Sequence, residues 1–168
     1  MVDERKEELI MLEKKAYNFE KEYGVCPQAV LYAFKEEYNI ISDELFKAGN
    51  GLAGGIGLMG SACGALLGGA MVIGMMSGRS YENLEDKEKN SFKSLTMVKK
   101  LTEKFNKKYK TFNCFSIQKE IMGKSYNLWS VEEKNNFLKA GGHEDKCTKV
   151  CGKAARWTAE ILINNKLL

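Results

Sequence analysis

Apolar residues recur at helical spacing along most of this chain. In the charged opening segment this spacing predicts an amphipathic helix over residues 1–23. A second helix is expected from Cys26, because Pro27 suits a first helical turn. Ser42 is a good N-cap for a short third helix over residues 43–48.

The middle of the chain is apolar and rich in glycine. No charged residue occurs between Lys47 and Arg79, and residues 51–78 contain ten glycines. A transmembrane helix is one interpretation of such a segment. The glycine-dense start and the lack of flanking aromatic residues favour a buried central helix over residues 59–76, entered from a glycine-rich turn.

Further helices follow, each with a capping residue. The expected caps are Ser80 or Asn83, Asn113, Ser130 with Glu133 as a capping box, and Asp145. The first of these helices is expected to reach residue 109 with an inner stripe of Leu84, Phe92, Leu95, Val98, Leu101 and Phe105. No strand-like alternation occurs, so the predicted fold is all-α, a single-domain helical bundle over residues 1–168. It comprises the N-terminal amphipathic helix, 1–23, and a cysteine-containing core, 24–168.

Charge and composition exclude several classes of function. The formal net charge of +4 is too small to indicate a nucleic-acid partner. The opening residues lack a basic segment followed by an apolar one, so a cytoplasmic protein is expected. In that reducing compartment five thiols indicate metal binding, redox activity or burial. No paired carboxylates suggest hydrolytic chemistry, and whether the chain is an enzyme stays open.

The glycines between Gly55 and Gly60 match the dinucleotide pattern G-x-G-x-x-G, with Gly57 at its centre. No β-α-β unit surrounds them, so dinucleotide binding is not predicted. Gly60, Gly64 and Gly68 instead fall four residues apart. On one helix face they would let another backbone approach closely.

The cysteines occupy notable places in the predicted helices. Cys26, Cys114 and Cys147 each fall in a first turn, where the helix dipole favours a thiolate, and Cys63 falls inside the central helix. Convergence of these thiols would suit an iron-sulfur cluster, zinc or a redox dithiol. The alternative is that each cysteine is simply a small apolar residue that fills a contact between helices.

Two residues near Cys147 are auxiliary candidates. Cys151 lies one helical turn beyond Cys147, as a spare ligand, a resolving thiol or part of the core. His143, the only histidine, either completes a mixed cysteine and histidine site or lies solvated in its glycine-containing loop.

Several motifs in order resemble the C-GCAxxG-C-C family of redox-active proteins. They are CPQAVL at 26–31, GGIG at 54–57 and CGALLG at 63–68, with Cys114 and Cys147 in helical contexts. The four family cysteines map to Cys26, Cys63, Cys114 and Cys147. Pro27 stands where the family often has a small residue, and Cys151 is additional to the family pattern.

The resemblance implies a particular chemistry. A related domain in split-Soret cytochromes is associated with an iron-sulfur centre, which favours a cluster over zinc or a dithiol. Haem is not expected, because this chain has no C-x-x-C-H motif. Family members are often encoded beside transporter genes, which implies a link to a membrane transporter.

Three functional hypotheses result. The first is electron transfer through an iron-sulfur cluster bound by the four cysteines, with a redox partner that the sequence does not identify. The second is a metal-free thiol-disulfide sensor or reductase that uses the same residues. The third is a non-catalytic module whose glycine-striped helix packs against a second copy of the chain or a transporter.

Overall fold

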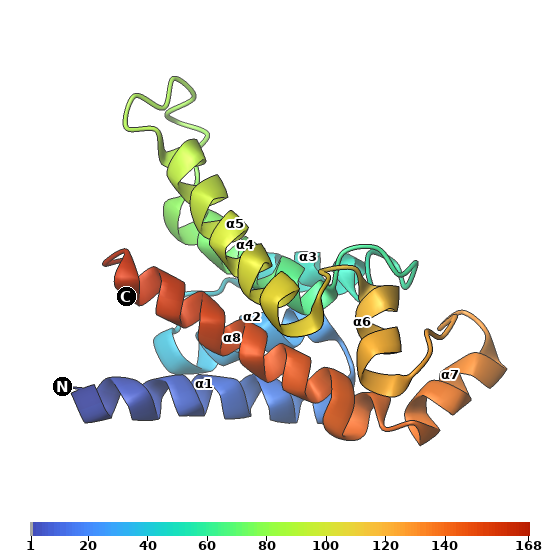
Figure 1. The fold of residues 1–168 in the computed structure, drawn as a ribbon. Helices are drawn as coiled ribbons and strands as arrows, with labels where there is room; N and C mark the ends of the chain where they lie inside the picture. The colour runs from blue at the N-terminus through green and yellow to red at the C-terminus, as the bar shows by residue number, and fades with distance from the viewer. Residues whose placement is uncertain (1) are drawn as a thin grey trace.

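Eight α-helices and two short helical turns make up the computed structural model, which describes residues 2–168 (Figure 1). The helices are α1 (Val2–Tyr23), α2 (Cys26–Tyr38), α3 (Asp43–Gly49), α4 (Gly64–Ser77), α5 (Asn90–Tyr109), α6 (Cys114–Met122), α7 (Val131–Lys139) and α8 (Cys147–Asn164). The turns are η1 (Asn50–Leu52), a 3-10 helix, and η2 (Gly142–Lys146), a π-helical turn. Within these residues extended backbone pairs only in an isolated bridge between Ala62 and Asn113. The all-α prediction is confirmed.

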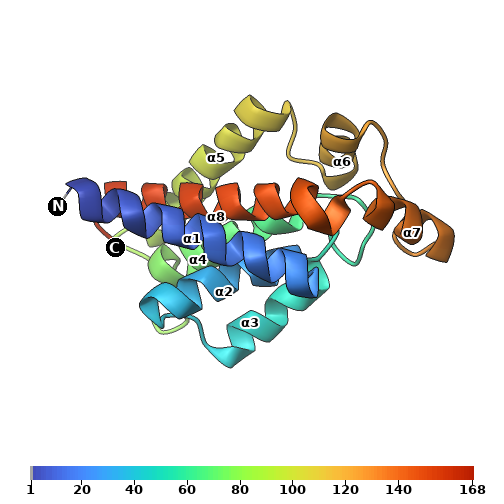
Figure 2. The same ribbon diagram turned by 90° about the horizontal axis from the view of Figure 1, so that it is seen from below.

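The bundle is organised around α1 and α8. These two helices run antiparallel and lie side by side in both views (Figures 1 and 2). Helices α2 and α4 pack against α8, and α5 packs on α4. The buried core draws on every one of these helices, for example through Leu12, Phe34, Ile73, Leu101 and Leu162. No helix in the described part of the chain has both the length and the apolar character needed to cross a membrane.

Three predicted caps are present. The side chains of Ser42, Asn113 and Ser130 each accept a hydrogen bond from the backbone N–H three residues further on, at 3.2, 3.0 and 3.3 Å. These bonds satisfy donors that have no partner inside the helix. The second half of the predicted capping box is not formed, because Glu133 accepts from the N–H of Asn127 instead.

Helix α5 begins later than predicted. Neither Ser80 nor Asn83 caps it, since the carboxylate of Asp86 accepts hydrogen bonds from the N–H groups of Asn90 and Ser91, at 2.7 and 2.9 Å. The start of the predicted inner stripe is therefore wrong. The residues that face solvent instead are Leu84, Phe92 and Leu95.

The start of α8 also differs from the prediction. Asp145 lies inside η2, and the N-cap position of α8 is Lys146, whose side chain makes no capping bond. The N–H of Cys147 donates to the carbonyl of Gly142. The helix thus begins as a continuation of a wider turn, with fewer free N–H groups than an ordinary N-terminus offers.

Candidate redox site

Four cysteines stand at the N-terminal ends of four different helices. Cys26, Cys114 and Cys147 are the first residues of α2, α6 and α8, as the sequence predicts. Cys63 is the N-cap residue of α4, so its predicted place inside that helix is wrong. The reason is that α4 begins at Gly64 rather than at residue 59.

A glycine-rich loop fills the space before α4. Gly54, Gly55, Gly57 and Gly60 all have positive φ angles, which side chains disfavour. A Cβ on Gly55 would lie 2.8 Å from the Cβ of Cys114, and one on Gly60 would overlap the ring of Phe115. The loop therefore needs glycine in order to lie against the start of α6.

The G-x-G-x-x-G pattern belongs to this loop. It follows η1, and no β-strand precedes it in residues 2–168. Its central residue, Gly57, accepts a hydrogen bond from the indole N–H of Trp129 at 2.9 Å. The pattern thus shapes a loop beside the cysteines rather than the opening of a β-α-β unit.

Backbone hydrogen bonds tie this loop to the start of α6. The N–H of Cys63 donates to the carbonyl of Phe112 at 2.8 Å, and the N–H of Cys114 donates to the carbonyl of Ser61 at 2.6 Å. These bonds hold two cysteines that are distant in sequence on adjacent stretches of backbone. The positions of Cys63 and Cys114 are thus set independently of their side chains.

Close packing of α4 on α2 places Cys26. A Cβ on Gly64 would overlap the sulfur of Cys26, and one on Gly68 would lie 2.6 Å from the carbonyl oxygen of Pro27. The close approach predicted for Gly64 and Gly68 is confirmed. Gly60 is not part of this helix face, because it lies in the loop.

Burial keeps the thiols protonated. It raises the pKa of Cys63 to about 11 and that of Cys114 to about 12, and it also raises the pKa values of the other three cysteines. The N–H groups of Ala65 and Leu66 lower the pKa of Cys63, but by less. The predicted preference for thiolate at these helix ends is therefore wrong, since the loss of water around sulfur outweighs the helix N–H groups.

The cysteines also act on one another through their charges. Ionised Cys63 raises the pKa values of Cys26, Cys114 and Cys147, and ionised Cys114 raises those of Cys26 and Cys147. Cys151 belongs to the same group, because its pKa rises with charge on Cys26, Cys63 and Cys147. Its thiol donates a weak hydrogen bond to the carbonyl of Cys26 at 3.8 Å.

Glu20 was not predicted from the sequence, but its charge raises the pKa values of all five cysteines. Its side chain is 2% exposed, and a hydrogen bond of 3.1 Å joins its Oε1 to Nδ1 of His143. Burial raises the pKa of Glu20, and the bond to His143 opposes that rise. The available signal was its spacing, because Leu12, Ala16 and Glu20 fall four residues apart on one face of α1 and the first two are core residues.

His143 is thus the partner of a buried carboxylate rather than a freely solvated side chain. Its ring packs edge-on against Phe137, with 5.1 Å between ring centroids. A Cβ on Gly24 would lie 3.0 Å from its Nε2. The imidazole is 28% exposed, so the ring lies between the buried carboxylate of Glu20 and the protein surface.

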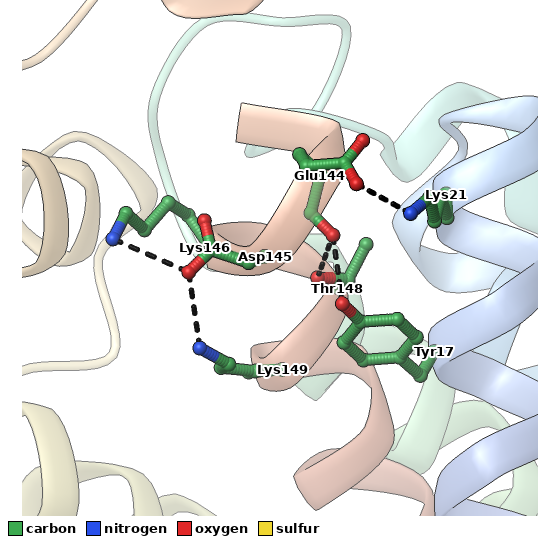
Figure 3. Close-up of polar contacts among 7 residues, drawn as sticks. All are labelled: Tyr17, Lys21, Glu144, Asp145, Lys146, Thr148 and Lys149. Atoms are coloured by element: carbon green, nitrogen blue, oxygen red, sulfur yellow. Dashed lines mark hydrogen bonds and ion pairs between the residues drawn. The ribbon is translucent and has the colours of Figure 1, made fainter. Parts of the chain in front are cut away.

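Polar contacts between α1 and η2 hold this region in place (Figure 3). Lys21 forms an ion pair with the carboxylate of Glu144 at 2.5 Å, and the hydroxyl of Tyr17 donates to the carbonyl of Glu144 at 2.8 Å. The Thr148 hydroxyl donates to the same carbonyl at 3.3 Å. Asp145 accepts from Lys149 at 3.0 Å, and this bond lowers the pKa of Asp145.

The arrangement of the side chains limits the kind of metal site. No three His, Cys, Asp or Glu side chains in the described residues are arranged to hold a metal ion. A mononuclear zinc site needs its donor atoms around one ion, at about 2.3 Å for sulfur. In the arrangement described, the side chains therefore form no ready-made site for zinc or for another metal ion.

Neither a curated protein nor a solved structure matches the chain, but a family defined by a pattern of cysteines and glycines does. A family model described as "Putative redox-active protein (C_GCAxxG_C_C)" matches residues 25–161, a span that contains all five cysteines. The chain therefore belongs to the C_GCAxxG_C_C family.

Proposed function

We propose that this protein transfers electrons through an iron-sulfur cluster bound by four cysteines. The proposed ligands are Cys26, Cys63, Cys114 and Cys147. The observation that carries the proposal is that four helices begin at these cysteines, with the start of α4 hydrogen-bonded to the start of α6 and the sulfur of Cys26 packed against Gly64. Charge on Cys63 also raises the pKa values of the other three thiols. Thiolates that repel one another in a buried site are stabilised when they share a cationic centre.

The donor set suits such a cluster. Four cysteine thiolates are the usual ligands of iron-sulfur clusters, and a bound cluster supplies a one-electron carrier. The chain also offers hydrogen-bond donors to the sulfurs. The backbone N–H of Gly54 forms a hydrogen bond with Cys26 that lowers the pKa of its thiol. The side-chain amide of Gln118 donates to the sulfur of Cys114 at 3.5 Å. Such bonds favour the ionised thiols that metal binding requires.

Burial gives the site a second property. Because the pKa values of the thiols are raised, ligation has to release protons to solvent. The proposed cluster should therefore assemble faster and bind more tightly at higher pH. A site dominated by exposed thiolates would show little dependence of this kind.

Anaerobic purification followed by reconstitution with iron and sulfide tests the proposal. We expect brown protein that contains both elements and whose visible absorbance is bleached by dithionite. Cys63→Ser should lose the cluster, and Cys151→Ser is the matched control, because Cys151 is equally buried but lies outside the four. Colourless wild-type protein without bound iron and sulfide would refute the proposal.

A metal-free function is the second candidate, and the contact between Cys151 and Cys26 favours it. The Cys151 thiol reaches the backbone of Cys26, and charge on Cys26 raises the pKa of Cys151. The two thiols would give two electrons and two protons to a disulfide oxidant and form one S–S bond. A reversible loss of two titratable thiols, mapped by peptide analysis to this pair, would support it. Failure to lose thiols under mild oxidation would exclude it.

A further inference from the structure

The side of α5 that faces solvent combines lysines with large apolar side chains. Phe92 and Leu95 lie one helical turn apart near the start of the helix, and they are 70% and 64% exposed. Lysines flank them at helical spacing. The outward face of α5 comprises Phe92, Lys93, Leu95, Lys99, Lys100 and Lys107, all of them exposed. Adjacent large apolar side chains left in water and rimmed by charge are typical of an interaction surface.

The charge of this face is strongly positive and mostly free. Residues 90–110 contain seven lysines and one acidic residue, Glu103. Lys99 forms an ion pair with Glu103 at 3.8 Å. Within residues 2–168 no acidic side chain pairs with Lys93, Lys100 or Lys107. The free lysines are therefore available to a negatively charged partner.

The position of α5 leaves this face open. The helix packs on α4 and α8, and Figure 2 shows it at the margin of the bundle, on the other side of α8 from α2 and α3. The loop before it projects from the bundle (Figure 1). That loop carries acidic residues, but Asp86 accepts hydrogen bonds from the first N–H groups of α5 and Glu85 pairs with Lys87 at 3.0 Å. A flat surface can therefore approach α5 along its outward face.

A hollow of about 340 Å³ lies beside this face, between α5 and the end of α8. Lys100, Lys104 and Lys107 line it from α5, and two asparagines line it from the end of α8, together with Glu103 and Ile161. Ammonium and amide groups are hydrogen-bond donors that suit phosphate oxygens. The hollow thus offers a place for the phosphate of a lipid headgroup.

We propose that the outward face of α5 binds the surface of a membrane that contains anionic lipids. The helix lies in the plane of the surface, Phe92 and Leu95 insert between the headgroups, and the lysines contact lipid phosphates. A basic helix with exposed aromatic and aliphatic side chains is typical of proteins that lie on a membrane. The proposal depends neither on the cysteines nor on a bound cluster.

Two other partners fit this face less well. A second copy of the chain, docked through the same face, would bring like charges opposite one another, which is unfavourable. A nucleic-acid duplex would neutralise the lysines through its phosphates but would leave Phe92 and Leu95 without an apolar partner. A membrane with anionic lipids satisfies both kinds of side chain.

Co-sedimentation of the whole chain with lipid vesicles tests the proposal. We expect binding to vesicles made of equal parts of phosphatidylglycerol and phosphatidylcholine, and none to vesicles of phosphatidylcholine alone. Each lysine near an anionic surface strengthens binding about fivefold. Salt at about 0.5 M should weaken the binding, because it screens these charges.

Two variants separate the apolar and the charged contributions. Phe92→Ala removes an inserted ring and should weaken binding about tenfold. Tyr23→Ala is its control, because Tyr23 is an exposed ring on α1. Lys100→Glu loses one attraction and adds one repulsion, so it should weaken binding about 25-fold. Lys14→Glu has the same net charge but changes an exposed residue of α1, so it should bind much more tightly than Lys100→Glu.

Several results would overturn the proposal. One is a lack of binding to the anionic vesicles, and another is an equal loss of binding in a variant and its control. Dimerisation that depends on Phe92, measured by light scattering without vesicles, would assign the face to a second copy instead. Binding of a DNA oligonucleotide that Lys100→Glu abolishes, without binding to vesicles, would assign it to nucleic acid. Because these measurements need no bound cluster, their failure would leave the proposed function untouched.

Discussion

Replacing Gly64 by alanine tests the close contact between the start of α4 and Cys26. Gly64 does not have a positive φ, so its requirement for glycine is spatial. An added Cβ would overlap the sulfur of Cys26 and lie 3.0 Å from the carbonyl oxygen of Leu52 and 3.1 Å from Cδ of Pro27. Two of these three neighbours are a backbone oxygen and a ring, which cannot rotate away. The same change at Gly74 meets nothing within 4 Å and provides the control on the same helix.

The expected magnitudes follow from packing and helix propensity. Overfilling a packed interior costs about 1–3 kcal/mol. Exchanging glycine for alanine within a helix gains about 0.5–1 kcal/mol. Gly64→Ala should therefore destabilise the protein by about 1–2 kcal/mol and Gly74→Ala should stabilise it by about 0.5–1 kcal/mol. For a chain of this size the two variants should melt about 3–12 °C apart.

Urea unfolding followed by circular dichroism measures both variants. Their midpoints should move in opposite directions while the dependence of free energy on urea stays the same. The displaced sulfur should also make Cys26 react faster with a maleimide in Gly64→Ala than in Gly74→Ala. Equal stability and equal thiol reactivity in the two variants would refute the packing described for Cys26.

Three further predictions concern the loop and the thiols. Asn113→Ala removes the cap of α6 and should lower the free energy of unfolding by about 0.5–2 kcal/mol, measured in urea. Stability should fall as the pH rises above 9.0 towards about 11, because folded Cys63 and Cys114 hold their protons more tightly than unfolded thiols do. Circular dichroism at increasing pH records this loss. Gly60→Ala should destabilise more than Gly57→Ala, because both have positive φ, which costs about 1–2 kcal/mol, but only the first also meets a ring.

Each of these three predictions has an outcome that would contradict it. Unchanged stability in Asn113→Ala would mean that the cap bond contributes nothing. For the alkaline transition, Cys63→Ser is the control, since serine does not ionise in this range and the loss should become smaller. A loss of stability that is the same in this variant would assign the transition to other groups. If Gly57→Ala proved as costly as Gly60→Ala, backbone conformation alone would account for the effect.

Helix starts that depend on residues nearby in the sequence were predictable. Pro27, Ser42, Asn113 and Ser130 act within one turn of their own helix, so the pattern alone placed those starts. The start of α4 was not predictable in this way. Residues before it adopt positive φ even without glycine, as at Ile56, where the loop is held by bonds to other parts of the chain.

The candidate site was also predictable only in part. Its cysteines could be identified from the sequence, because each lies in a short local motif. The raised pKa values were not predictable, because they depend on how deeply the packed helices bury each thiol. Glu20 was missed for a related reason. In a segment with many charged residues, only its spacing from Leu12 and Ala16 distinguishes it from the solvent-facing ones.

The antiparallel pairing of α1 and α8 has a consequence for how the protein matures. Glu20 comes from α1, whereas Cys147 is supplied by α8, so the two sides of the site are made at opposite stages of synthesis. A growing chain that lacks α8 has only three of the four thiols and leaves the apolar face of α1 uncovered. Loading of the proposed cluster is therefore expected only after α8 has been translated, and a chain that stops before that point exposes apolar surface of the kind that chaperones bind.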